Sequence, residues 1–446
     1  MNSINKSIIF VYPSYYGDKG QILKVGQSWL PPRTLSYMAA LTPGRFTTRI
    51  VDERAEDIDF SAGDLIALTG MLHHMPRAID IAREFRKNGK KVIIGGPGVF
   101  ALQNEPKVTG NFDSIVIGEA ETAWNIVLND FEKEGLKKIY RPEPLKELKR
   151  LPFARLDLLN AKHYRKAITD PNKFVIPMET SRGCPHSCKF CLVTRYFGKT
   201  IRYRPIPEVI DEIKFQGGNY IFFTDDNIAV NPTRAIELFT ALKPLGIHWF
   251  GQFDTTVVNH PEIIKLAGES GCRSAFIGIE SLDKENLVSI QKKHNVGVEV
   301  GELLRLFKQA HINVMCSVIF GMEHDSHESI RETVNFMLDN RVEMMLPWIL
   351  TPFPMTPLHE EFKTGNRLLH DNYSQYDCTH CVHQPGQMKP AELENAYWES
   401  YRHFYNTGAV IRRGLNGRSP VDGLKILIRE LYFKNNVSHR RHPFLS

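Results

Sequence analysis

Three cysteines that stand close together are the residues of this sequence best suited to chemistry. Cys184, Cys188 and Cys191 follow one another with three and then two intervening residues. Three thiolates can each bind one iron of a [4Fe–4S] cubane and leave the fourth iron open to another ligand. A structural zinc site takes four ligands, so zinc would need His186 or a distant residue to complete its set. The spacing therefore favours an iron–sulfur cluster with one open iron.

The elements around these cysteines predict an open partial barrel. A strand at Phe174–Glu179 precedes the cysteine loop, and helices such as Pro207–Gln216 and His327–Leu338 alternate with later strands. We expect Asp325 to cap the second of these helices, with Glu328 three residues on. Six βα units are too few for a closed barrel of eight, and the functional groups are expected at the carboxyl ends of the strands. The five later strands are predicted at Tyr220–Thr224, His248–Phe253, Ser274–Ile279, Val314–Phe320 and Glu343–Leu350.

The preceding part of the chain predicts a Rossmann-like, doubly wound parallel sheet. Glycine-rich turns follow two of its strands, at Gly95, Gly96 and at Gly118, Glu119. Such turns lie where open α/β sheets bind nucleotides or corrinoids, although glycines also serve simply to turn the chain. Buried strands are predicted at Ile8–Tyr12, Arg49–Val51, Leu65–Thr69, Val92–Ile94 and Ser114–Ile117, and helices at Thr34–Leu41 and Arg77–Arg86.

The sequence thus predicts an α/β protein of four segments. Residues 1–140 form the Rossmann-like domain, and residues 141–170 form a charged, proline-containing linker. Residues 171–357 form the partial (βα)6 barrel, and residues 358–446 form a mainly helical extension with many aromatic side chains. A chain of 446 residues is long enough for several hydrophobic cores.

The segment Ser181–Cys191 resembles the cluster-binding loop of the radical S-adenosylmethionine (SAM) superfamily, and the resemblance extends from about residue 7 to about residue 430. It implies that the open iron chelates SAM. It also implies that an electron, delivered by a donor such as flavodoxin or ferredoxin, cleaves SAM to methionine and a 5′-deoxyadenosyl radical. The resemblance names no general base, so the catalytic residues stay unknown.

The same resemblance assigns cofactor contacts to four further positions. Phe190 is expected near the adenine, Asp225 near the SAM amino group, Glu280 near SAM, and Gly321 in the segment that packs on adenine. The family's usual Gly-Gly-Glu is absent after the second strand, so the contact of Asp225 is open. Each residue taken alone is equally well explained as an ordinary residue at a strand end or, for Phe190, as a shield for the cluster.

A subfamily with an N-terminal cobalamin-binding domain is also indicated. The stretch Leu350–Pro357 is similar to a segment of that subfamily, as are the turns that hold Gly95, Gly96, Gly118 and Glu119, and the end of the chain is similar to hopanoid-methylase-like members. The resemblance implies a cobalamin cofactor. The first domain has no Asp-x-His-x-x-Gly motif for cobalt; either His73 or His74 approaches the crevice, or both are packing residues and cobalamin binds without a lower histidine.

Three functions follow from this resemblance and stay open. One is a cobalamin-dependent methyltransferase that acts on an unactivated carbon of a small-molecule or lipid-like substrate. The second is radical cyclisation, carbon–carbon coupling or rearrangement without methyl transfer, and the third is a non-catalytic iron–sulfur or corrinoid sensor. Cys378 and Cys381 could belong to a second metal centre or donate hydrogen, whereas Cys272 and Cys316 are expected in the core.

Charge and hydropathy limit the location and the partners. The chain has no apolar run long enough to span a membrane and no apolar signal segment, so we expect a cytoplasmic protein. No nucleic-acid partner is expected. Residues 402–446 hold nine Lys and Arg against two acidic residues. This basic region is either a solvated surface or a peripheral contact with a membrane.

Overall fold

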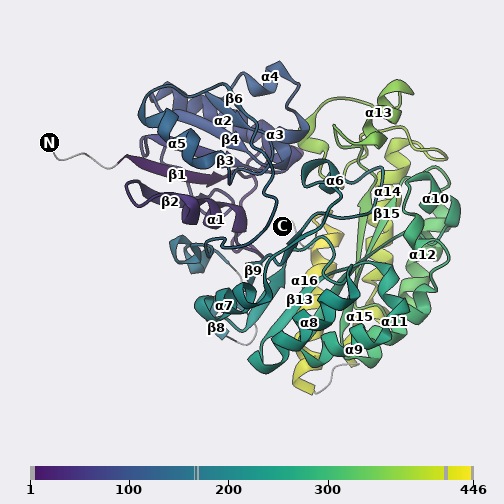
Figure 1. Ribbon diagram of the computed structural model, residues 1–446. Coiled ribbons are helices and arrows are strands. Elements are labelled where there is room, and N and C mark those ends of the chain that lie inside the picture. The colour runs from purple at the N-terminus through teal and green to yellow at the C-terminus, as the bar shows by residue number, and fades with distance from the viewer. Residues whose placement is uncertain (1–5, 165, 168–169, 416–419, 443–446) are drawn as a thin grey trace.

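The computed structural model describes residues 6–164, 166–167, 170–415 and 420–442. Figure 1 shows two α/β bodies side by side, followed by helices that return to the second body. The predicted fold class is confirmed: a doubly wound parallel sheet precedes a partial barrel and a helical C-terminal region.

The first body is built on a six-stranded parallel sheet in the order β2-β1-β3-β4-β5-β6. The chain places β2 on one side of β1 and the later strands β3 to β6 on the other side. A topological switch point therefore lies between β1 and β3. The carboxyl ends at such a point form a crevice for ligands. The strands are β1 (Ser7–Tyr12), β2 (Thr47–Asp52), β3 (Leu65–Thr69), β4 (Lys91–Gly95), β5 (Ser114–Val116) and β6 (Ile139–Tyr140).

Alternation along β1 explains why helices cover both faces of this sheet. Ile8 and Phe10 pack in one core with residues of α1 (Arg33–Leu41) and α5 (Trp124–Glu132). Ile9 and Val11 point to the opposite face, because successive side chains of a strand alternate, and pack with residues of the remaining helices. Those helices are α2 (Met75–Lys87), α3 (Pro97–Ala101) and α4 (Pro106–Thr109).

The second body holds an open parallel sheet in the order β16-β15-β14-β13-β12-β9. Its strands are β9 (Ile176–Met178), β12 (Tyr220–Phe223), β13 (His248–Phe253), β14 (Cys272–Glu280), β15 (Asn313–Phe320) and β16 (Met344–Ile349). Its helices are α6 (Val193–Tyr196), α7 (Ile206–Gln216), α8 (Pro232–Leu242), α9 (Pro261–Glu269), α10 (Lys284–Ser289), α11 (Val300–Gln309) and α12 (His327–Asp339). The chain thus makes the six strands that the sequence predicts for this region.

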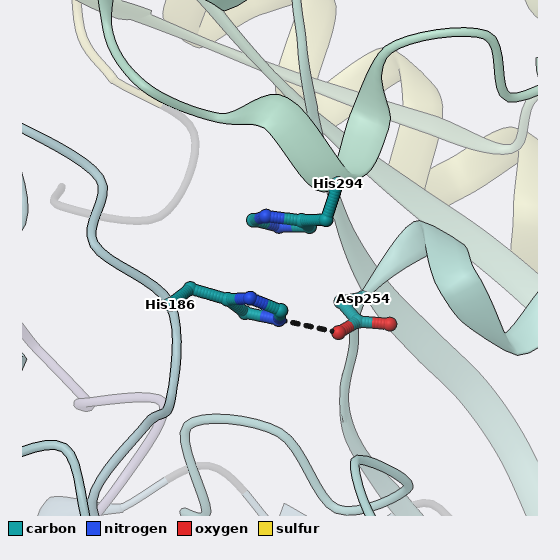
Figure 2. Close-up of side chains that lie close together, drawn as sticks. All are labelled: His186, Asp254 and His294. Atoms are coloured by element: carbon teal, nitrogen blue, oxygen red, sulfur yellow. Dashed lines mark hydrogen bonds and ion pairs between the residues drawn. The ribbon is translucent and has the colours of Figure 1, made fainter.

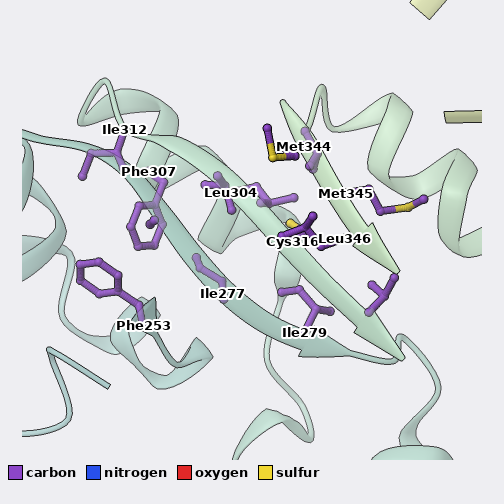
Figure 3. Packing of buried hydrophobic residues seen from close by; sticks show 14 of the residues in the cluster. Phe253, Ile277, Ile279, Leu304, Phe307, Ile312, Cys316, Met344, Met345 and Leu346 are labelled. Carbon is purple, nitrogen blue, oxygen red and sulfur yellow. The ribbon is translucent and has the colours of Figure 1, made fainter. Parts of the chain in front are cut away.

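One face of this sheet packs on the surrounding helices (Figure 3). Ile277 of β14 and Cys316 of β15 lie in a single core with Leu304 and Phe307 of α11. Cys272 is also fully buried, so both expected core cysteines are confirmed. This packing fixes the strands, and with them the residues that follow their carboxyl ends.

Three local features differ from the sequence predictions. The cap of α12 is Ser326, whose hydroxyl accepts from the N–H of Ser329, so the expected cap at Asp325 is wrong. Asp325 instead accepts hydrogen bonds from the N–H groups of Gly321 and Met322. The chain also forms short antiparallel pairs that were not predicted: β7 (Lys166–Ala167) with β8 (Asp170–Phe174), and β10 (Ser181–Arg182) with β11 (Arg202–Tyr203).

The C-terminal region contacts both bodies. Its helices are α13 (Pro357–Thr364), α14 (Pro390–Phe404), α15 (Thr407–Leu415) and α16 (Pro420–Ser438). Tyr397 and Tyr401 of α14 belong to the core of the second body, whereas Tyr376 and Val382 of the preceding loop belong to a core of the first. Among the described residues, no helix combines the length and the apolar character that a membrane span requires.

Candidate active site at the junction of the two sheets

The cysteine loop begins at a strand that the neighbouring strand end holds in place. Asp225, directly after β12, is buried and accepts hydrogen bonds from the Thr180 hydroxyl at 2.7 Å and the Thr180 N–H at 2.9 Å. The Ser181 hydroxyl donates to the same carboxylate at 2.5 Å. Asp225 therefore anchors the entry to the loop, and its contact with SAM stays a prediction. The N–H of Gly183 donates to the next carboxylate, Asp226, whose pKa is raised to about 7 mainly by burial.

The three cysteines suit a cluster better than a single ion. Cys184, Cys188 and Cys191 are free thiols, partly buried and close enough to interact electrostatically. Their sulfur atoms do not all lie within 4.8 Å of one another, whereas two thiolates on one zinc would be at most about 4.6 Å apart. Burial raises the pKa of Cys188 to about 11 and that of Cys191 to about 12. The thiolates therefore need a nearby cation such as iron to form at neutral pH.

A histidine inside the loop ties it to the end of β13 (Figure 2). The imidazole of His186 lies 2.8 Å from the carboxylate of Asp254 and stacks on His294, with ring centroids 3.6 Å apart and planes within 12°. These three residues are close enough to hold a metal ion. However, the nitrogen lone pairs of two parallel stacked imidazole rings run alongside each other and do not converge on one ion. Asp254 also already accepts hydrogen bonds from Thr256 and Asn227. The arrangement instead positions the loop.

A buried lysine and glutamate lie beside the cysteines at the end of β14. The ammonium of Lys292 donates to Glu280 at 2.5 Å, and the hydroxyl of Ser317 donates to the other oxygen of that carboxylate at 3.3 Å. Burial opposes the charge of Lys292, but Glu280 and the thiols of Cys188 and Cys191 raise its pKa. A Cβ at Gly278 would meet the ends of the Glu280 and Lys292 side chains, so a larger residue there would displace this pair. Glu280 therefore faces the cluster loop in the place where a SAM contact is predicted.

Phe190 and Gly321 lie at the rim of the second body. Phe190 packs against a small apolar cluster that includes Ile319, Met322 and Leu350. Gly321 has a φ of 94°, and its carbonyl accepts from the imidazole of His383 at 3.1 Å. A Cβ at Gly321 would clash with Leu393 of α14. Both residues are thus next to the C-terminal region, and their contacts with adenine stay predictions.

A cavity of about 360 Å³ lies between the carboxyl edge of the first sheet and the cysteine loop. All four residues predicted from the first domain line it, namely Gly95, Gly96, Gly118 and Glu119. Its size falls in the range of roughly 300–1,000 Å³ that is usual for small-molecule and cofactor sites. The first body also contributes Phe10, Leu35, Thr69 and Trp124, and the second contributes Glu179, Arg182, Leu192, Val193, Tyr196 and Phe197.

The backbone of the cavity leaves room for a bulky ligand. Gly118 has a φ of 111°, and a Cβ built on it would meet nothing within 4 Å. No histidine is among the described residues that line the cavity. His74 instead accepts from the N–H of Met71, and His73 stacks at an angle on His74 and Tyr15. Both histidines therefore pack against neighbouring residues and do not line the cavity.

A buried ion-pair network joins the first body to the start of the cysteine loop. Arg182 lies 2.7 Å from Glu119, 2.5 Å from Glu121 and 2.8 Å from Glu179. Arg202 also pairs with Glu119 at 2.7 Å, and Arg33 pairs with Glu179 at 3.5 Å. Burial works against the charge of Glu179, but the arginines outweigh it and lower its pKa. We call these six residues the Arg182 network.

Sequence reasoning did not find Lys292 or Arg182. Lys292 follows a glutamine and precedes a second lysine, which is typical of a solvated surface. Arg182 stands two residues before the first cluster cysteine, which is the one signal in the sequence that could have indicated its role. Cys378 and Cys381, in contrast, do not join any group of three close metal-ligating side chains among the described residues.

Comparison with known proteins identifies the family of this chain. A sequence profile of the Radical SAM superfamily matches residues 178–337. Bacteriochlorophyllide d C-12(1)-methyltransferase of Chlorobaculum tepidum is 30% identical over 392 residues, which are 86% of this chain and 84% of that protein. The chain belongs to the radical SAM superfamily. The predicted family is thus confirmed, and the protein is a radical SAM enzyme.

Two further likenesses extend over most of this radical SAM enzyme. Bacteriochlorophyllide d C-8(2)-methyltransferase of Chlorobaculum tepidum is 27% identical over 428 residues, 92% of each chain. The structure of TsrM, a radical SAM methyltransferase of Kitasatospora setae with cobalamin and a [4Fe–4S] cluster bound, superposes with a TM-score of 0.65. It is 15% identical and covers 90% of this chain and 89% of TsrM, which shows a shared fold.

Proposed function

We propose that this protein is a cobalamin-dependent radical SAM methyltransferase that acts on a carbon atom of a tetrapyrrole. The observation that carries the proposal is the cavity shared by the first sheet and the cysteine loop. Leu192 and Val193, directly after Cys191, form one wall, and the glycine turns of a Rossmann-like sheet form the other. A cofactor in the cavity would therefore lie next to a cofactor on the cluster.

The chain's own residues fit the groups that the proposal requires. When bound, the cluster and SAM supply a 5′-deoxyadenosyl radical, and cobalamin supplies a methyl group. Cys184, Cys188 and Cys191 would hold three irons, and the pair of Lys292 and Glu280 would face the SAM carboxylate and ammonium groups. Cobalamin would bind without a lower histidine, because the described cavity wall contains none.

The remaining partners are also proposals. A tetrapyrrole substrate is supported by the two relatives whose names specify methyl transfer to bacteriochlorophyllide d. We propose that a flavodoxin or ferredoxin supplies the electron, since the cluster cysteines are only partly buried. The buried Arg182 network would exclude water from the border between the two cofactors.

Anaerobic reconstitution tests the radical chemistry. The protein is loaded with iron, sulfide and hydroxocobalamin, and is then mixed with SAM, a strong reductant and a bacteriochlorophyllide. We expect 5′-deoxyadenosine, S-adenosylhomocysteine and a substrate in which a methyl group replaces one hydrogen atom. Formation of 5′-deoxyadenosine with an unmethylated, rearranged product would support the non-methylating alternative. A loaded protein that forms no 5′-deoxyadenosine would refute both.

A cavity-filling variant tests the cobalamin site by itself. Ala120 lines the cavity, so Ala120→Trp should prevent retention of the corrin absorbance after desalting. Ile126, on α5 of the same body, is 49% exposed and does not line the cavity, so Ile126→Trp is the matched control. Equal corrin retention by wild type and both variants would place cobalamin elsewhere.

A further inference from the structure

Helix α16 has apolar side chains on two opposite faces. Phe433 and Val437 are buried in the core of the second body, and Leu427 packs partly buried at the edge of this core. An outward stripe runs along the other side through Val421, Leu424, Ile428 and Leu431, each of which is 50–64% exposed. Their spacing of three, four and three residues places them in one row along a helix. The row has no packing partner among the described residues.

The exposed apolar side chains of the protein are concentrated in α15 and α16. Sixteen large apolar side chains are exposed in the described part of the chain, and seven of them lie between residues 411 and 432. Leu415, at the end of α15, is the most exposed of all at 81%, and Ile411 is 50% exposed. Scattered apolar residues are normal on a protein surface, but a contiguous patch marks a contact with another apolar phase.

The C-terminal region that contains α15 and α16 carries much of the positive charge of the protein. Residues 402–446 hold nine Lys and Arg and two acidic residues, a net charge of +7, whereas the whole chain has +6. One of the two acids, Glu430, is buried and paired with Arg413 at 2.7 Å and Arg429 at 3.1 Å. Lys425 is exposed within the apolar stripe, and Arg412 is exposed beside Ile411. The apolar stripe is therefore flanked by free cations.

We propose that the α15–α16 hairpin docks this protein onto an anionic lipid bilayer. A helix with an apolar row and flanking Lys and Arg lies in the plane of the membrane interface, with its apolar side chains among the acyl chains. A second copy of the chain fits less well, because two C-terminal regions of net charge +7 would repel each other. In Figure 1 this yellow helix runs from the lower edge of the second body to the middle of the molecule.

Vesicle flotation of the full chain tests the proposal. We expect binding to vesicles of phosphatidylcholine with phosphatidylglycerol, weaker binding to phosphatidylcholine alone, and a decrease as salt is raised. The double variant Leu424→Ser/Ile428→Ser should bind at least tenfold more weakly, because two apolar side chains no longer enter the bilayer. Arg412→Gln/Lys425→Gln should lose roughly tenfold or more on anionic vesicles.

A matched control separates the hairpin from general surface apolarity. Phe215, on α7, is 67% exposed, and Phe215→Ser should bind vesicles as the wild type does. Circular dichroism verifies that each variant is folded. Flotation that is unaffected by both double variants would overturn the proposal. So would a wild-type dimer in sedimentation that Leu424→Ser/Ile428→Ser converts to a monomer, because the stripe would then be a protein interface. The test does not depend on cofactor loading, so it stands apart from the methyltransferase proposal.

Discussion

Replacing Arg182 by leucine should destabilise the protein more than any other single loss of an ion pair at the junction. In the variant, Glu119 keeps its ion pair with Arg202, and Glu179 keeps its ion pair with Arg33. Glu121, with a side chain 8% exposed, keeps no ion-pair partner among the described residues. A carboxylate left buried and unpaired costs about 3–5 kcal/mol. We expect a loss of that size in the unfolding free energy at pH 8.

The loss of unfolding free energy in Arg182→Leu should grow as the pH rises. A carboxyl group that is buried without a cation is less costly in its protonated form than as a carboxylate. A group with a raised folded pKa is least costly below the unfolded pKa, and its cost grows as pH rises through the folded pKa. The destabilisation by Arg182→Leu should therefore be smaller at pH 5 than at pH 8.

Urea unfolding followed by tryptophan fluorescence measures both effects. Arg155→Leu is the control, because Arg155 and Asp157 form a pair whose side chains are 45% and 62% exposed, and such pairs contribute at most about 1 kcal/mol. Hydrogen exchange should also become faster in the loop of Gly118–Glu121. A variant within about 0.5 kcal/mol of wild type, or one that loses as much at pH 5 as at pH 8, would refute the reasoning.

Three further predictions concern single residues. Cys188→Ala should abolish the visible cluster absorbance and the formation of 5′-deoxyadenosine; retention of either would exclude its role as an iron ligand. Lys292→Met should lower the cluster's reduction potential by tens of millivolts or so in an EPR titration, because a cation beside Cys188 and Cys191 is lost, whereas Lys292→Arg should not. His380→Gln should cost about 2–3 kcal/mol below pH 6.5, since Asp377 raises the pKa of His380 to about 9 against burial. That difference is lost as pH rises through 9, and a urea series that shows no such convergence would contradict the assignment.

The sequence predicts most of the sheet and part of the site for identifiable reasons. Apolar runs such as Leu65–Thr69 are buried on both faces, so their positions as strands follow from composition alone. Two-residue strands such as β10 (Ser181–Arg182) are too short to carry a pattern. Cys184 and its two neighbours are local in sequence, and their spacing is sufficient to indicate a cluster.

The other parts of the site depend on contacts between distant segments. Asp225 stands where a polar strand-end residue is expected, but its bonds to Thr180 and Ser181 exist only because β12 pairs with β9. Lys292 becomes a buried cation only through the turn after α10. The cavity wall requires the two bodies to meet, which no local pattern specifies.

The position of the cavity between the two bodies has a consequence for assembly. Its walls come from both sheets, and the Arg182 network joins those walls across one corner. A corrin bound in the cavity would contact both bodies at once. Neither body would therefore hold it alone, and separating the two bodies should release it.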